Sequence, residues 1–161
     1  MPHTDNQLSS EVAPRILQLL GSQHVLTLAC RDAEGCWAAA VFYAAMGHEL
    51  VFCSSERSRH VRALACDERP AGEIHAEASD WRTILGLQLA GRVRRLAGDE
   101  IECARRVYAA RFPFAGRDAS PELARALERV AWFGYRIERA MLIDNARGFG
   151  QRAVWTPPEP G

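Results

Sequence analysis

The stretch from residue 24 to residue 54 alternates short apolar runs with tight turns, and this pattern constrains the fold more than any other. Apolar runs at 24–30, 36–45 and 49–54 predict three strands, separated by short turns that contain glycine. The run 36–45 is almost continuously apolar, which predicts that both of its faces are buried. The chain is therefore expected to open as a β-meander.

The remaining pattern adds helices and further strands around this meander. Val12, Ile16 and Leu19 recur at helical spacing, and Pro14 suits the first turn of that helix. The other expected helices cover 55–66, 99–111 and a segment from Ser120, and the other expected strands cover 72–78, 83–96, 131–145 and 151–155. Such a set of strands and helices indicates a mostly β, α+β fold such as an antiparallel barrel. We expect one domain over residues 1–161, with loose tails at 1–10 and 156–161.

Every basic residue of this chain is arginine, 20 in all, and lysine is absent. No lysine Schiff base can form, which excludes the usual covalent pyridoxal-phosphate chemistry. A phosphate loop that ends in Lys-Ser or Lys-Thr is excluded as well. Any anionic ligand must be held by guanidinium groups, histidine, hydroxyls or backbone N–H groups. The formal net charge of zero argues against a dedicated nucleic-acid binder.

The cysteines and the apolar runs indicate a cytoplasmic protein. The five cysteines form an odd set without a C-x-x-C pair, as expected for reduced thiols. The first residues lack the apolar core of a signal peptide, and the longest apolar run, 37–47, is too short to span a bilayer. Histidines and cysteines lack the spacing of metal ligands, so we expect no metal site, and no catalytic acid or base is assigned.

The segment from Phe52 to His60 is the strongest candidate for a binding site. A strand ends at Ser54, and the following helix begins with hydroxyls and the basic residues Arg59 and His60. Helix starts present free N–H groups and a partial positive charge, so this junction could hold a phosphate. A capped helix with a solvated basic first turn remains the alternative.

Two later segments carry weaker signals. Gln88 is a lone amide on an otherwise apolar strand, and either a ligand ring or neighbouring backbone could satisfy it. The strand that contains Trp132–Arg136 is followed by a glycine-rich turn that ends in Arg152, which could bring a cation towards a site. Arg92, Arg94 and Arg95 are expected to form a solvated basic face rather than an RNA contact.

Several of these segments, in this order, resemble the FMN-binding split-barrel family, whose best-known members are the pyridoxamine-phosphate oxidases. The resemblance covers residues 23–155 and is nearest to a small bacterial branch of the family. The residues that carry it are Gln23-His-Val, Thr27, Trp37, Phe42-Tyr43, Arg59-His60, Gly86-Leu-Gln88, Gly91, Ala104-Arg, Tyr108, Arg111-Phe-Pro113, Asp144-Asn145 and Gly148-Phe-Gly150.

The resemblance implies a six-stranded antiparallel split barrel with flanking helices, a homodimer, and FMN in a groove at the dimer interface. Ser58-Arg59-His60 stands where the oxidases hold the FMN phosphate with Ser-Arg-Lys, and Ser54 matches a hydroxyl just after the strand. Gln88 matches a glutamine that contacts the flavin ring. Arg152 is a looser match to the family's last flavin-contacting cation.

Departures from the oxidase pattern bear on function. The lysine of the phosphate segment is replaced by His60, and the substrate-binding Arg-Leu-His run is replaced by Gly148-Phe-Gly-Gln-Arg152. We therefore expect an FMN-dependent oxidoreductase that acts on a small molecule other than vitamin B6. A carrier or sensor module without turnover, which binds a flavin, a deazaflavin or haem, is the alternative. A structural dimer that has lost its cofactor is a third possibility.

Overall fold

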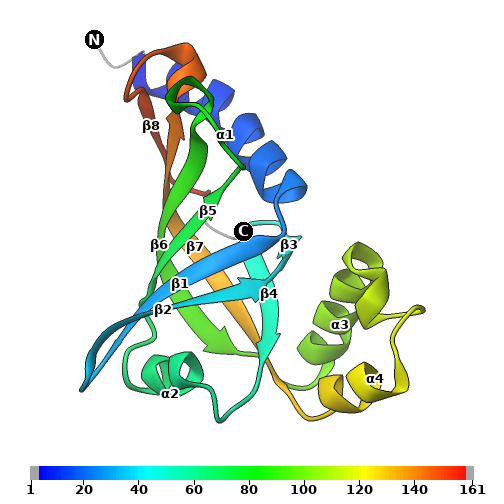
Figure 1. The fold of residues 1–161 in the computed structure, drawn as a ribbon. Coiled ribbons are helices and arrows are strands. Elements are labelled where there is room, and N and C mark those ends of the chain that lie inside the picture. Colours follow the sequence, from blue (N-terminus) through cyan, green and yellow to red (C-terminus); the bar gives the residue numbers. More distant parts are fainter. Residues whose placement is uncertain (1–3, 159–161) are drawn as a thin grey trace.

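The computed structural model describes the backbone of residues 4–158 and the side chains of residues 11–158. The chain forms a strongly curved sheet with helices at its two ends and along one side (Figure 1). The α-helices are α1 (Thr4–Ser22), α2 (Arg59–Cys66), α3 (Asp99–Arg111) and α4 (Pro121–Leu127). The strands are β1 (Val25–Asp32), β2 (Gly35–Phe42), β3 (Ala44–Met46), β4 (Glu49–Ser54), β5 (Ala71–His75), β6 (Leu85–Arg95), β7 (Ala131–Asp144) and β8 (Arg152–Trp155).

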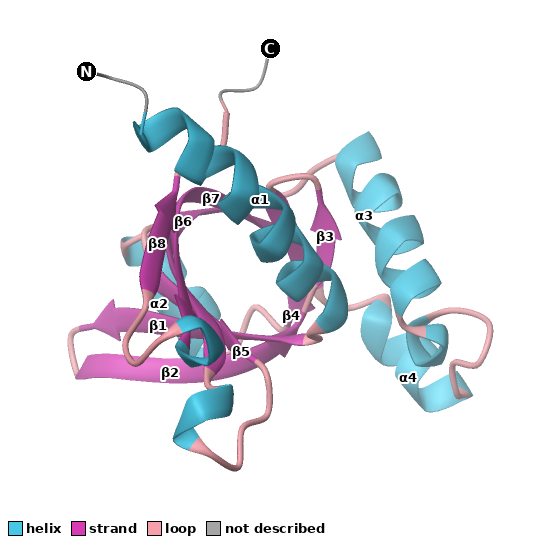
Figure 2. Cartoon of the chain, turned by 90° about the horizontal axis from the view of Figure 1, so that it is seen from above, coloured by secondary structure: helices cyan, strands magenta, loops and turns pink. Residues whose placement is uncertain are grey.

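The strands form one antiparallel sheet in the order β2-β1-β5-β6-β7-β4-β3, and β8 pairs with β7 beside this path. The sheet curls into a barrel, and α1 lies across one end of it (Figure 2). In the described residues the outer strands of the path, β2 and β3, do not pair, so the barrel is split. The expected count of six strands is wrong: the path has seven, and β8 is additional.

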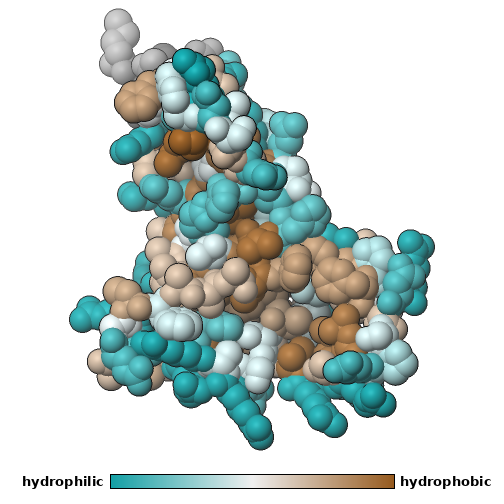
Figure 3. Space-filling view, in the orientation of Figure 1, coloured by the Kyte–Doolittle hydropathy of each residue, from teal (hydrophilic) through white to brown (hydrophobic). Residues whose placement is uncertain are grey.

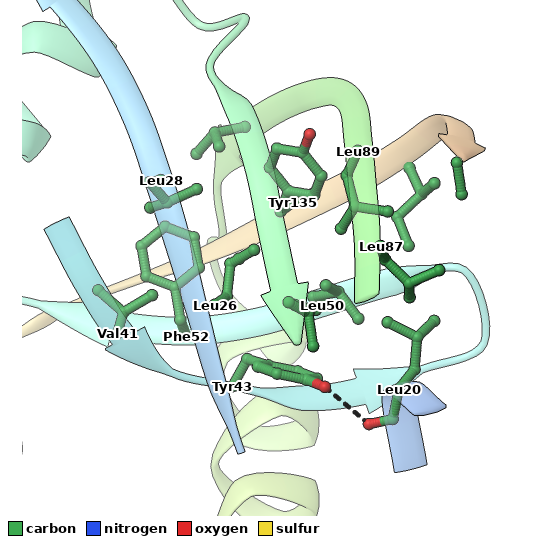
Figure 4. Close-up of a cluster of buried hydrophobic side chains, with 14 of the residues drawn as sticks. Leu20, Leu26, Leu28, Val41, Tyr43, Leu50, Phe52, Leu87, Leu89 and Tyr135 are labelled. Carbon is green, nitrogen blue, oxygen red and sulfur yellow. Dashed lines mark hydrogen bonds between the residues drawn. The ribbon is translucent and has the colours of Figure 1, made fainter. Parts of the chain in front are cut away.

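The barrel interior is filled by the inward side chains of the strands and closed by α1. Leu20, Leu26 and Phe52 are among the fully buried residues of this core (Figure 4). Tyr43 is also buried, and its hydroxyl donates a hydrogen bond of 2.8 Å to the carbonyl oxygen of Leu20 in α1. Burial raises the pKa of Tyr43 to about 12, so this hydroxyl stays a donor at neutral pH. The bond fixes α1 to the strand region it covers.

A second, smaller core lies outside the barrel, where α3 packs against β3 and β4. Tyr108 of α3 and Phe112, the residue that follows this helix, are buried here with Trp132 of β7. The rings of Tyr108 and Trp132 meet edge-on at 5.3 Å between centroids. Acidic residues in the first turn of α3 and Arg111 in its last turn match the helix dipole.

The sequence expectations for two segments were wrong. The helix α1 begins at Thr4 and contains Pro14 in its interior, so residues 4–10 are helical rather than a loose tail. Residues 1–3 and 159–161 lie outside the described part, and residues 156–158 have no regular structure. In β2 only Val41 is buried, so the expected burial of both faces is also wrong.

The basic end of β6 is not simply solvated. Arg94 binds both carboxylate oxygens of Glu49 at 2.8 and 3.0 Å and also contacts Glu100 at 2.6 Å. Arg92 pairs with Glu68, and Arg95 with Glu56. The negative charge of a glutamate therefore balances the positive charge of each of these arginines.

Among residues 4–158, every helix is too short or too polar to cross a membrane.

Gly91 is required by close packing between β6 and β7, at the point where the strand register shifts. A Cβ atom at this position would overlap the carbonyl oxygen of Arg136 and press on the ring of Tyr135. Gly91→Ala is expected to lower the free energy of unfolding by about 1–3 kcal/mol, the usual cost of overpacking. Urea denaturation measures this change. Gly21→Ala in α1, where no atom lies within 4 Å, is the control and is expected to be neutral or stabilising.

Candidate functional site

Three polar side chains meet where β4 ends and α2 begins. The Ser54 hydroxyl lies 2.7 Å from Nε2 of His60 and 3.4 Å from the Ser58 hydroxyl, and Ser58 lies 3.3 Å from the same imidazole nitrogen. Burial lowers the pKa of His60, which favours the neutral imidazole in the free protein. We call Ser54, Ser58 and His60 the hydroxyl–imidazole cluster.

The start of α2 leaves its backbone donors available beside this cluster. Ser58 occupies the N-cap position, but its hydroxyl donates to the carbonyl oxygen of Ser55 at 2.8 Å and does not cap the helix. The first turn of α2 also contains no acidic residue. Free N–H groups, the helix dipole and the cluster together suit an oxyanion. The helix expected over 55–66 thus begins at Arg59, with Ser58 at the N-cap position but without a side-chain cap.

Arg59 is held by the β1–β2 hairpin rather than by the cluster. Its Nε and one terminal nitrogen donate to the two carboxylate oxygens of Asp32 at 2.7 and 2.9 Å. Its guanidinium also lies 4.5 Å from the ring centre of Trp37, and Glu34 is 3.6 Å away. The hydrogen bond from Arg59 lowers the pKa of Asp32 to about 2, so the pair is ionised at neutral pH. An anion that recruits Arg59 has to compete with Asp32.

Gln88 and Arg152 lie towards the other end of the barrel. Gln88 faces outward from β6 between Glu73 and Met141, so its amide is exposed rather than buried among apolar neighbours. It lines a cavity of about 430 Å³. Arg152 is the first residue of β8, is exposed, and pairs across from Ile143.

Pairing along β7 shows how far these residues are from the cluster. Ser54 pairs with Ala131 and Gln88 pairs with Met141, so the two positions are ten residues apart on the same strand. At about 3.3 Å per residue this separation is roughly 30 Å. One chain therefore brings Ser54, Ser58 and His60 together, but it does not bring Gln88 or Arg152 to them.

Sequence reasoning missed the residues that surround these candidates. Asp32 lies at the turn expected between the first two strands, where no local pattern indicates a partner, although it holds Arg59. The pair of Glu73 and His75, with Oε1 and Nδ1 at 2.8 Å, also went unnoticed beside Gln88. No local pattern links the carboxylate of Asp32 to Arg59, which lies 27 positions later in the sequence. The alternation of side chains along β5, in contrast, could have placed Glu73 and His75 on one face of the strand. In the described part of the chain no group of three potential ligands gathers as a metal site.

The fold and this geometry define a split-barrel protein with a polar strand–helix junction on one chain. No family model matches the chain. The UPF0306 protein YhbP of Escherichia fergusonii is 30% identical over 147 residues, which are 90% of this chain and 93% of that protein. The UPF0306 protein YhbP of Escherichia coli O127:H6 is likewise 30% identical, over 98% of its length. The chain belongs to the UPF0306 family.

Solved structures share the same fold. A heme binding protein from Mycobacterium smegmatis aligns with a TM-score of 0.69 and 29% identity, over 86% of this chain. The aligned region is 55% of that protein, so this chain spans about half of its length. A FAD-binding protein from Mesorhizobium loti aligns with a TM-score of 0.64 and 16% identity, over 80% of this chain and 91% of that one. At this identity the second likeness shows the fold alone.

Proposed function

We propose that the protein binds FMN at sites shared by the two chains of a homodimer and acts as a cytoplasmic FMN-dependent oxidoreductase on a small molecule. The hydroxyl–imidazole cluster at the uncapped start of α2 carries this proposal. Two hydroxyls and one imidazole lie within 3.4 Å of each other, next to free helix N–H groups. This donor set fits the phosphate of FMN.

The second half of the proposed site comes from the partner chain. Gln88 and Arg152 suit the ring end of a flavin, because an amide can bond the ring's polar edge and a guanidinium can balance its charge. They lie roughly 30 Å along β7 from the cluster of the same chain, which is farther than one FMN molecule reaches. A second copy that packs against the first supplies the missing half.

The outward face of the sheet supports such a pairing. Four alanines lie side by side across adjacent strands and are all exposed: Ala38, Ala29, Ala71 and Ala90. Val25 and Phe42 pair with each other on the same face, four residues along β1 and β2 from Ala29 and Ala38, and 42% and 46% of their surfaces are open. Hydrophobic colours gather here and extend towards α3 (Figure 3). An exposed apolar face of this kind is typical of an interface between copies of a chain.

Bound FMN would supply the hydride chemistry, while the residues of the chain would anchor and orient it. The cluster holds the phosphate, and Arg59 moves from Asp32 towards the phosphate when FMN binds. Gln88 orients the ring from the partner chain. The whole chain, residues 1–161, forms one domain in this proposal.

The alternative is a carrier or sensor module that binds haem or a flavin without turnover. The likeness to a heme binding protein, at 29% identity, supports haem as the alternative ligand. His48 and His75 line cavities, but the described histidines favour flavin because each of them already contacts another side chain. His48 packs edge-on against Trp155, His60 contacts Ser54, His75 contacts Glu73, and His24 lies near Phe112.

Absorption spectroscopy separates these functions. Protein that has been incubated with FMN and freed of excess ligand should show bands near 375 and about 450 nm, whereas haem would give one intense band near 400 nm. Protein that retains neither would contradict the proposal. Stopped-flow reduction of the bound flavin by NADH or NADPH, followed by reoxidation, then distinguishes an enzyme from a carrier.

The protonation of His60 should make anion binding depend on pH. Burial lowers the pKa of His60 in the free protein, and a bound anion favours the protonated form, so affinity should rise as the pH falls. Sulfate is a suitable probe because its own charge stays constant in this range. Between pH 7.5 and 5.5 we expect its affinity to rise by about fivefold to tenfold. Calorimetric titration measures this, and His60→Gln should remove the dependence; an unchanged slope in that variant would place the titrating group elsewhere.

A further inference from the structure

Two loops at the α1 end of the barrel present a pair of exposed aromatic rings. Trp81 lies in the short helix Trp81–Thr83 between β5 and β6, and Phe149 lies between β7 and β8. Their rings meet edge-on with centroids 5.5 Å apart. Trp81 is 48% exposed and Phe149 is 84% exposed. Large aromatic side chains that meet outside the core indicate a surface that contacts a ligand.

Asn145 holds the two loops together. Its side-chain amide donates to the carbonyl oxygen of Trp81 at 2.7 Å, and its side-chain oxygen accepts from the N–H of Gly150 at 3.1 Å. Its backbone N–H donates to the carbonyl oxygen of Ile84 at 3.0 Å. Asn145 is the one buried polar residue of the described chain. The aromatic pair is therefore presented from a fixed support, which lowers the entropy lost when a ligand binds.

The cavity of about 430 Å³ that contains Gln88 begins where these loops leave the sheet, because Ile84 and Ile143 both line it. Glu73 and Glu77 contribute carboxylates, His75 lies beside them with its Nδ1 2.8 Å from Oε1 of Glu73, and no arginine lines the cavity. Apolar lining from Leu85, Leu87 and the two isoleucines completes the surface.

The nearest guanidinium groups are already used or lie outside the cavity. Arg82 stacks on the ring of Trp81 at 4.7 Å and pairs with Asp80 at 3.1 Å. Arg152 lies on β8, beyond Ile143. An anionic ligand would thus meet two carboxylates, and the one basic side chain of the lining, His75, is already bonded to Glu73. A neutral or cationic ligand does not meet this repulsion.

We propose that this cavity and the Trp81–Phe149 pair form the substrate site, and that the site takes a planar aromatic molecule without negative charge. The ring lies against Trp81 and Phe149, and an amine or ring cation faces Glu73 and Glu77. The role as substrate site rests on the proposed function, because Gln88 lines the same cavity and would place the molecule beside the flavin. The phosphorylated substrates of pyridoxamine-phosphate oxidases are excluded by this charge.

Three small molecules with one ring and different charges test the proposal: 1-methylnicotinamide, nicotinamide and nicotinate. Calorimetric titrations are made on the protein with FMN and on the protein without it. We expect the cation to bind most tightly and nicotinate to bind at least about tenfold more weakly. Trp81→Ala and Phe149→Ala should each weaken binding of the cation by about tenfold and leave the dissociation constant of FMN within about twofold.

Phe114→Ala is the matched control, because Phe114 is an exposed aromatic residue, 40% open, that packs near Phe112 instead. It should leave binding of all three molecules unchanged. The proposal would be overturned if the three molecules bind equally well, if none of them binds, or if the cation binds the Trp81 and Phe149 variants as tightly as the unaltered protein. A protein that fails to bind FMN but binds the cation through Trp81 would contradict the proposed function alone.

Discussion

Replacing Ala71 by arginine is expected to convert the protein to a monomer and to weaken FMN binding by at least about 100-fold. Ala71 lies at the centre of the exposed row, between Ala29 on β1 and Ala90 on β6. A long charged side chain there prevents the two exposed faces from meeting. The loss of FMN follows because the cluster and Gln88 then have no partner chain. Light scattering coupled to gel filtration gives the mass, and fluorescence titration gives the affinity.

The matched control is Ala126→Arg, since Ala126 is exposed on α4 and lies outside the sheet. Its mass and FMN affinity should equal those of the unaltered protein. Circular dichroism and the urea midpoint should show that Ala71→Arg keeps its fold, because its side chain points to solvent. A folded monomer that binds FMN normally would contradict the shared site. A dimer that persists in Ala71→Arg would place the interface on another face.

The second large effect concerns the ion pair of Arg59 and Asp32. If Arg59 moves to the phosphate, Arg59→Ala should weaken FMN binding by about 10- to 100-fold. Asp32→Ala should strengthen it by up to about tenfold, because the guanidinium no longer has a competing carboxylate, 2.7 Å away in the free protein. Both affinities are obtained by quenching of flavin fluorescence.

Riboflavin is the control ligand for this pair, because it has the same ring and no phosphate. Neither substitution should alter its affinity by more than about twofold. We expect Arg59→Ala to weaken FMN binding and Asp32→Ala to strengthen it, and we expect neither substitution to change riboflavin binding. If both substitutions weaken FMN and riboflavin alike, Arg59 only fixes the hairpin, and the phosphate is held without it.

Much of the fold was predictable because local patterns determine it. The strand at Glu49–Ser54 and the helix at Asp99–Arg111 agree with the expected ranges, since turn residues and the charge order of the helix mark their ends. Ser120 was expected at a helix start, and its side chain accepts a hydrogen bond from the N–H of Leu123.

The failures have long-range causes. Pro14 lies inside α1 because burial of Val12 and Ile16 against the barrel outweighs the lost hydrogen bond, and the local pattern suggests only a first-turn proline. The sequence pattern of an apolar strand such as β2 is the same whether residues of its own chain or of another chain cover it. The binding of Arg59 to Asp32 depends on how the hairpin meets α2, which no local pattern encodes.

The shared site is tested most directly by complementation between two inactive variants. One chain carries Ser54→Ala with His60→Ala, and the other carries Gln88→Ala with Arg152→Ala, so each homodimer lacks one half of both sites. In a random mixture half of the dimers are mixed, and each mixed dimer has one intact site. The account predicts that coexpression restores FMN binding to about a quarter of all sites. If coexpression restores no FMN binding, while both homodimers are folded and fail to bind FMN, the shared site is contradicted.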